Sequence, residues 1–141
     1  MTQKTRAKPV AAASVSGEEK PYGVRIDSGG HGLRGDEPAS HGGGDTGPTP
    51  FGLLLSGLGA CTAITLRMYA ERKQWPLSGI DVELSYLAPD RSTRWIDRVI
   101  TLRGPLDDDQ RAKLAEIAEK TPVTKAVRAG TEIRTTIRQI R

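Results

Sequence analysis

The longest charge-free stretch of the chain, residues 51–66, predicts a long buried helix. Thr49 and Pro50 precede it, and this pair is typical of a helix start because threonine caps free N–H groups and proline fits the first turn. Apolar side chains occur all around the helical wheel, with small residues between them, so we expect other parts of the fold to cover the helix on every side. Further along, the pattern becomes amphipathic, and the helix is predicted to end near residues 75–76.

Alternation of polar and apolar positions predicts strands on both sides of this helix. Gly and Pro clusters at residues 28–30 and 89–90 supply the turns between paired strands. The predicted strands lie around residues 10–15 and at 22–27, 31–36, 81–86, 95–103 and 133–137.

A second helix is predicted to begin at Asp107, because Gln110 follows three residues later in the pattern of a capping box. It should stop at Thr121–Pro122, since proline disfavours a helical residue before it. The predicted elements follow one another in the order strands, helix, strands, helix, strand, and this order indicates an α+β fold. We expect residues 1–20 to be a loosely ordered N-terminal segment and residues 21–141 to form a single domain.

A chain of 141 residues has little other structure with which to surround an apolar helix. The covering surface should therefore come partly from a second copy of the chain. We expect an obligate homodimer on this ground.

Composition narrows the classes of partner. The chain is 36% hydrophobic and 27% charged, and it contains no apolar run that we judge long enough to span a bilayer. Its net charge of +4 is spread out and few aromatic residues accompany it, so we expect neither a membrane nor a nucleic-acid partner. Only His31, His41 and Cys61 offer nitrogen or sulfur to a metal, so we expect no metal and no cofactor.

Cys61 is the only cysteine, so no internal disulfide can form. Oxidising compartments favour paired cysteines, which makes a cytoplasmic location the expectation. The local pattern leaves two interpretations of Cys61 open, a reactive nucleophile or a small buried hydrophobe. No protease signature links it to His41, and burial alone would raise the pKa of the thiol.

Two other motifs have simpler explanations than catalysis. The glycine-rich stretch His41–Gly44 is similar to an esterase oxyanion loop, but no Gly-x-Ser-x-Gly follows it. The acidic run Asp107–Asp109 lies at a predicted helix start, where carboxylates favour the helix dipole.

Several segments together closely resemble the OsmC-like branch of the OsmC/Ohr family, over roughly residues 22–140. The spacing from the Gly-Pro-x-Pro motif to the Ala-Cys pair is the most specific feature. The matching segments are 36–38, 43–50, 53–55, 58–62, 66–70, 104–108 and 114–120.

The resemblance implies a fold of two antiparallel-rich sheets around two central helices, assembled as an intertwined homodimer. It also implies thiol-dependent reduction of hydroperoxides, organic ones especially, in oxidative-stress defence. Cys61 occupies the position of the family's attacking cysteine, and an external thiol or dithiol would be the reductant. The chemistry needs a thiolate, because only the thiolate is strongly nucleophilic.

The chain departs from the family pattern at the second, resolving cysteine, where Thr121 stands. The family's glutamate after the helix-start proline is replaced by Phe51. The family's activating arginine lies on an early strand, and our candidates for it are Arg25 first, then Lys20 and Arg34. Asp36 or, as our preferred choice, Glu37 would supply a carboxylate.

Two functions remain open on this basis. In one, Cys61 is the nucleophile of a one-cysteine peroxidase whose sulfenic acid is cleared by an external thiol. In the other, the protein has lost turnover and binds a small apolar ligand in the same pocket, or has a structural role.

Overall fold

The computed structural model describes residues 7–17 and 21–140. Part of the predicted loosely ordered segment, residues 1–6 and 18–20, lies outside the described residues. The chain forms two compact units, Met1–Leu54 and Leu55–Arg141, and each is described by itself below.

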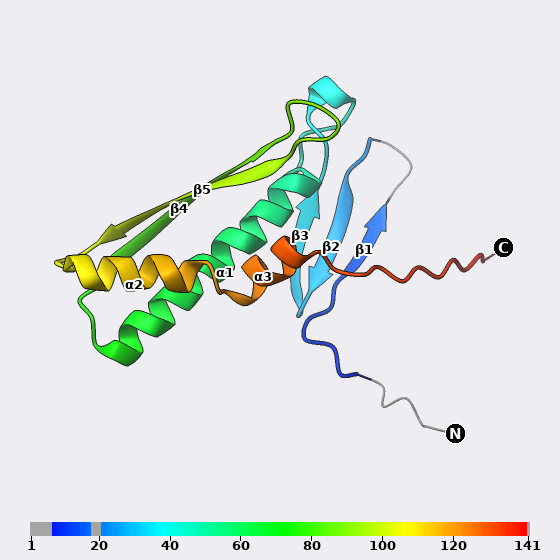
Figure 1. The fold of residues 1–141 in the computed structure, drawn as a ribbon. Helices are drawn as coiled ribbons and strands as arrows, with labels where there is room; N and C mark the ends of the chain where they lie inside the picture. The colour runs from blue at the N-terminus through cyan, green and yellow to red at the C-terminus, as the bar shows by residue number, and fades with distance from the viewer. Residues whose placement is uncertain (1–6, 18–20, 141) are drawn as a thin grey trace. The chain divides into compact units, whose positions relative to one another are not determined.

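The first unit contains a three-stranded antiparallel sheet in the order β1-β2-β3 (Figure 1). Its strands are β1 (Ser14–Gly17), β2 (Val24–Ser28) and β3 (His31–Gly35), so the first strand begins later than predicted. Ser28 pairs with His31, and the two residues between them, Gly29 and Gly30, have φ of 59° and 81°. Two successive positive φ angles close a tight hairpin that glycine accepts without strain.

After β3 the chain folds back on a buried carboxylate. Asp36 is only 3% exposed. Its oxygens accept hydrogen bonds from the Thr46 hydroxyl at 2.6 Å and from the backbone N–H groups of Glu37, Gly44 and Thr46 at 2.7, 3.4 and 3.1 Å. The Thr46 hydroxyl is the main reason that the pKa of Asp36 is lowered to about 2. Asp36 therefore fixes the glycine-rich loop, which includes the short 3-10 helix η1 (Ala39–His41).

The long apolar helix is confirmed as α1 (Pro50–Lys73). The backbone N–H of Gly52 donates to the Thr49 hydroxyl at 3.0 Å, which confirms the predicted cap. The expectation that no apolar stretch has membrane-spanning length is wrong, because α1 is long and apolar enough by length and composition. The core helix of a soluble protein passes the same test when it is mostly buried. In α1 Leu58, Thr62 and Leu66 are buried, but only 17% of the apolar window is.

The second unit packs the later part of α1 against a two-stranded antiparallel sheet and a further helix (Figure 1). The sheet consists of β4 (Gly79–Leu87) and β5 (Trp95–Arg103), and the helix is α2 (Asp108–Ala118). Both sides of the predicted capping box are present at Asp107 and Gln110. The buried core consists of Leu66, Ala70, Leu77, Leu106, Leu114 and Ala118.

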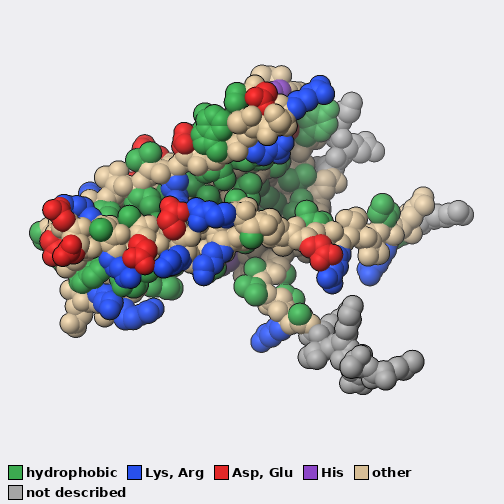
Figure 2. Space-filling model, viewed as in Figure 1, with side chains coloured by type: hydrophobic (Ala, Val, Ile, Leu, Met, Phe, Trp, Pro, Cys, Tyr) green, Lys and Arg blue, Asp and Glu red, His purple; other side chains and the backbone are tan. Residues whose placement is uncertain are grey.

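Figure 2 shows charged side chains along the outer surface of α2. Gly59 of α1 lies so close to the sheet that an added Cβ would stand 2.8 Å from a methyl carbon of Leu84. This close approach explains one of the small residues in the apolar helix. Other apolar side chains of α1, Ile64 and Met68 among them, are exposed in the single chain.

The C-terminal part differs from the prediction in two ways, although α2 does end before Thr121–Pro122 as predicted. Thr121–Pro122 does not merely end a helix but starts another, α3 (Pro122–Ala129), in which Thr121 is the capping residue. The strand expected at residues 133–137 is absent, and no regular element follows Gly130 in the described residues. Ile133 and Ile137 are exposed, because no neighbouring strand in the described chain pairs with this segment.

We predict that Asp36→Asn destabilises the first unit at neutral pH, because an amide cannot accept all four hydrogen bonds. The folded-state pKa of Asp36 is about 2, below the ordinary value of 3.8, so its ionised form stabilises the fold above about pH 4. That contribution is lost as the pH falls through about 2. Chemical unfolding of the wild type and of Asp36→Asn at pH 7 and pH 2 measures this contribution as a difference in the free energy of unfolding. Asp27→Asn, at an exposed position, is the control. Equal stability at pH 7 would contradict the prediction.

Candidate functional site

Cys61 lies about three turns into α1, on a face that the second unit partly buries. Thr62 beside it is fully buried, and so is Leu66 one turn further on. The Thr65 hydroxyl is 3.9 Å from the Cys61 sulfur. The sulfur therefore has a polar neighbour on its own helix, although the helix around it is apolar.

The N-terminus of α3 supplies two more donors to the same sulfur. The Thr121 side chain and the backbone N–H of Val123 both act as donors that lower the pKa of Cys61. Pro122 occupies the start of this helix, and the N–H groups of a first helical turn have no partner within the helix. The positive end of the α3 dipole thus meets the sulfur, which favours a negative charge there.

Opposing effects set the acidity of the thiol. Burial is the largest single influence and raises the pKa of Cys61. Hydrogen bonds from Val123, Thr121 and Thr65, together with the charge of Arg98, act in the other direction and outweigh burial. The pKa of Cys61 is therefore lowered from its ordinary value, which is the direction that a nucleophilic thiol needs. Burial in α1 alone gave the opposite expectation, because the sequence did not reveal the donors from α3.

Arg98 of β5 is a site residue that sequence reasoning missed. Its side chain is only 11% exposed. Nη1 donates to the hydroxyls of Thr62 and Thr124 at 3.1 and 2.9 Å, and Nη2 donates to the Ala118 carbonyl at 3.0 Å. A sequence signal was present: Arg98 interrupts the inward-facing series Ile96, Ile100 and Leu102 of an alternating strand.

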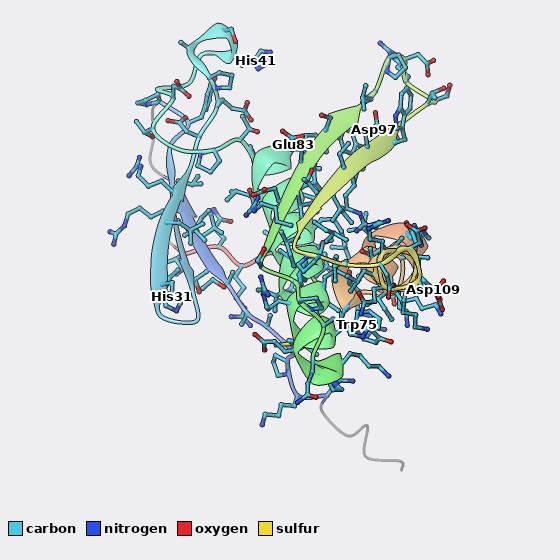
Figure 3. The ribbon with its side chains drawn as sticks, turned by 90° about the vertical axis from the view of Figure 1, so that its left-hand side faces the viewer. His31, His41, Trp75, Glu83, Asp97 and Asp109 are labelled. Atoms are coloured by element: carbon cyan, nitrogen blue, oxygen red, sulfur yellow. The ribbon has the colours of Figure 1, made fainter. Side chains whose placement is uncertain are left out.

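Figure 3 labels Glu83 and Asp97, one on each strand of the β4–β5 hairpin. Both side chains are on the exposed face, as the alternation of the two strands requires. Leu84 and Arg98 pair directly across the ladder and lie on the opposite, partly buried face. The hairpin therefore directs one cation inward and leaves its acidic residues in solvent.

Arg25 and Glu37, the predicted activating residues, belong to the first unit. Arg25 is on β2 opposite Arg34 of β3. Glu37 Oε2 lies 3.8 Å from Nδ1 of His41. Their role in activating Cys61 stays a prediction. Figure 3 shows His31 and His41 at opposite ends of this unit. No group of three or more metal-binding side chains occurs among the residues that the structure describes.

A cavity of about 710 Å³ adjoins the site within the second unit. Arg98 and Thr124 are part of its wall, so it begins close to the donors around Cys61. Its lining combines apolar and cationic side chains: Leu58, Tyr86, Arg94, Trp95, Ile96, Arg98, Glu119, Thr124, Val127 and Arg128.

Comparison with known proteins identifies the family. The model of the OsmC-like protein family matches residues 42–136, which is more than half of the chain. The chain belongs to the OsmC family. No curated protein matches its sequence.

Solved structures share the fold of this OsmC protein. An OsmC-like protein of Mycoplasma pneumoniae is 15% identical, with a TM-score of 0.74 over 86% of this chain and 89% of that one. The organic hydroperoxide resistance protein OhrB of Bacillus subtilis is 24% identical, with a TM-score of 0.60 over 84% of this chain and 90% of that one. A Vibrio cholerae protein, described as an organic hydroperoxide resistance protein with captopril in one of its active sites, is 19% identical, with a TM-score of 0.63 over 91% and 90%.

Thr121 is the residue predicted to stand at the resolving position, and it acts on Cys61 in the structure. The Thr121 side chain is fully buried. It therefore supplies a hydrogen-bond donor where a resolving thiol was expected from the resemblance. Its assignment to the resolving position stays a prediction.

We predict that Thr121→Val raises the pKa of Cys61, because the thiolate loses a hydrogen bond that the nearly isosteric valine cannot replace. Ultraviolet absorbance of the thiolate, followed against pH, measures the change. The substitution also removes the cap of α3, at a cost of about 1 kcal/mol, so circular dichroism should confirm that the variant is folded. Thr131→Val, in the C-terminal segment, is the matched control. An unchanged pKa in folded Thr121→Val would show that the hydroxyl does not act on the sulfur.

Proposed function

We propose that this protein is a one-cysteine, thiol-dependent peroxidase that reduces hydroperoxides, organic ones especially, through Cys61 in oxidative-stress defence. The observation that carries the proposal is the set of donors converging on the sulfur, which lowers its pKa although the helix around it is apolar. Two of the structural relatives are described as organic hydroperoxide resistance proteins, which supports the same chemistry.

The reaction follows from the properties of a thiolate. The Cys61 thiolate attacks the outer oxygen of the hydroperoxide, the O–O bond breaks, and the alkoxide leaves and takes up a proton to become an alcohol. Cys61 is then a sulfenic acid. An external thiol condenses with it, releasing water and forming a mixed disulfide, and a second thiol restores Cys61. The reductant must come from outside, because the chain has no second cysteine.

The cavity favours a second candidate, binding of a small, largely apolar ligand without turnover. Leu58, Trp95 and Ile96 offer apolar surface there, and three arginines would attract an anionic group on such a ligand. This candidate and the peroxidase make opposite predictions for the fate of Cys61 in peroxide.

We predict that an organic hydroperoxide converts Cys61 to sulfenic and then sulfinic acid, which mass spectrometry after rapid mixing would detect. In Thr121→Cys the new thiol should attack the sulfenic sulfur, forming a disulfide that dithiothreitol reduces. Over-oxidation should then fall and turnover should rise. Thr131→Cys is the control, since it adds a thiol outside the site. If Cys61 resists hydroperoxide in both proteins, ligand binding becomes the leading function.

We propose that the protein acts in the cytoplasm as a homodimer. The exposed apolar side chains of α1, among them Ile64 and Met68, support a second copy as the covering surface. A long exposed apolar surface is rare on a monomer in water.

We predict that light scattering at micromolar concentration gives the mass of two chains. A charge at the exposed apolar surface, as in Ile64→Glu, should shift the mass to one chain, whereas Glu71→Lys on the same helix should not. A wild-type monomer that stays stable on dilution would contradict the dimer. If the wild-type protein is recovered in solution only with detergent, a membrane rather than a second copy is favoured as the covering surface.

A further inference from the structure

Four side chains in the second unit form a continuous row of polar contacts that ends at the sulfur. Arg98 Nη1 is 2.9 Å from the Thr124 hydroxyl. The Thr124 and Thr121 hydroxyl oxygens are 2.6 Å apart. Thr121 is in turn one of the groups that lower the pKa of Cys61. Thr121 and Thr124 are both buried, so bulk water does not replace these contacts.

The number of protons on these groups fixes the direction of the row. A guanidinium only donates, and each threonine hydroxyl has one proton to give while its oxygen can accept. When Cys61 is a thiolate, Thr121 donates to the sulfur, Thr124 donates to Thr121, and Arg98 donates to Thr124. All three bonds then point toward the negative charge, an arrangement in which each bond strengthens the next.

The same atoms allow the opposite direction when Cys61 is a neutral thiol. The S–H then donates to Thr121, and Thr121 donates to Thr124. The Thr124 proton has a second acceptor for this state, the Ala118 carbonyl at 3.3 Å. The 2.6 Å contact between the two hydroxyls serves either direction, since either oxygen can be the donor, so the charge on the sulfur decides which way the row points.

Arg98 is held firmly enough to set that direction. It bridges Thr62 of α1, the Ala118 carbonyl at the end of α2, and Thr124 of α3. Its counter-charge is Glu119, whose Oε1 is 3.6 Å from Nη2, and Arg128 also pairs with this carboxylate. The charged groups that line the adjoining cavity, among the described residues, are Arg94 before β5, Arg98 from β5, Glu119 after α2 and Arg128 from α3.

We propose that Arg98, Thr124 and Thr121 form a hydroxyl relay that holds Cys61 as a thiolate and reverses when the sulfur is protonated. Arg98 and Thr124 are positioning residues in this relay, since neither is shown to contact the sulfur, and Thr121 is its final donor. The inference rests on the proposed function only in that a thiolate is the reactive form. It gives a role to the threonine that stands in place of a resolving cysteine.

The test is the rate at which iodoacetamide alkylates Cys61, measured against pH, because this rate follows the thiolate without requiring any peroxidase activity. Thr124→Val removes the middle hydroxyl and should raise the pKa of Cys61 by about one unit, which lowers the alkylation rate near neutral pH about tenfold. Thr124→Ser keeps the hydroxyl and should restore most of the rate. Thr131→Val is the matched control, since it removes a threonine hydroxyl outside the relay and outside the cavity.

A double-mutant cycle separates a relay from independent contacts. Arg98→Met alone should lower the alkylation rate at least as much as Thr124→Val. If Arg98 acts through Thr124, the double variant should lose clearly less than the product of the two single losses. If the double variant instead loses as much rate as the two single losses multiplied together, the two residues act separately, and this result would overturn the relay.

Glu119→Gln gives a test of the opposite sign on an exposed residue, which keeps the proposal falsifiable if the buried variants do not fold. Removing the counter-charge leaves the positive charge of Arg98 less neutralised, so the pKa of Cys61 should fall and alkylation near neutral pH should accelerate. A slower or unchanged rate would contradict the proposal.

The two proposals fail in distinguishable ways. Wild-type protein that shows these alkylation effects yet ignores hydroperoxide would keep the relay and reject the peroxidase. If wild-type protein reduces hydroperoxide but Thr124→Val and Glu119→Gln leave the alkylation rate unchanged, the peroxidase is kept and the relay is rejected.

Discussion

The guanidinium of Arg98 is the contact on which the arrangement around the sulfur depends. A buried arginine needs its donors satisfied, because an unpaired charge away from water is costly. Here the acceptors come from three separate helices, Thr62 on α1, the Ala118 carbonyl on α2 and Thr124 on α3. Satisfying one cation therefore fixes the end of α2 and the start of α3 relative to the helix that carries Cys61.

That placement decides what Cys61 can do. A thiol in the middle of an apolar helix would ordinarily be a poor nucleophile, because burial disfavours its charged form. The first turn of α3 counters this with the Val123 N–H and the Thr121 hydroxyl. Thr121 thus has two roles: it caps α3, and it is one of the groups that lower the pKa of Cys61.

Local signals predicted most of the fold. The Thr49 cap, the Asp107 capping box and the alternation of β4 and β5 each depend on neighbours a few residues away, and each is confirmed. Thr121–Pro122 carried the same signal as Thr49–Pro50, yet we interpreted it only as a helix end, so α3 was missed. The strand at 133–137 failed for a different reason, because alternation alone does not provide a neighbouring strand to pair with.

The sequence by itself determined that this protein has one thiol and no internal disulfide, and its motifs identified the family. Only the tertiary structure decided the environment of that thiol. The donors from α3 and the cation behind them lie 37 to 62 residues further along the chain, and packing of α1, β5 and α3 brings them together. Acidity depends on such three-dimensional neighbours, which a local pattern does not encode.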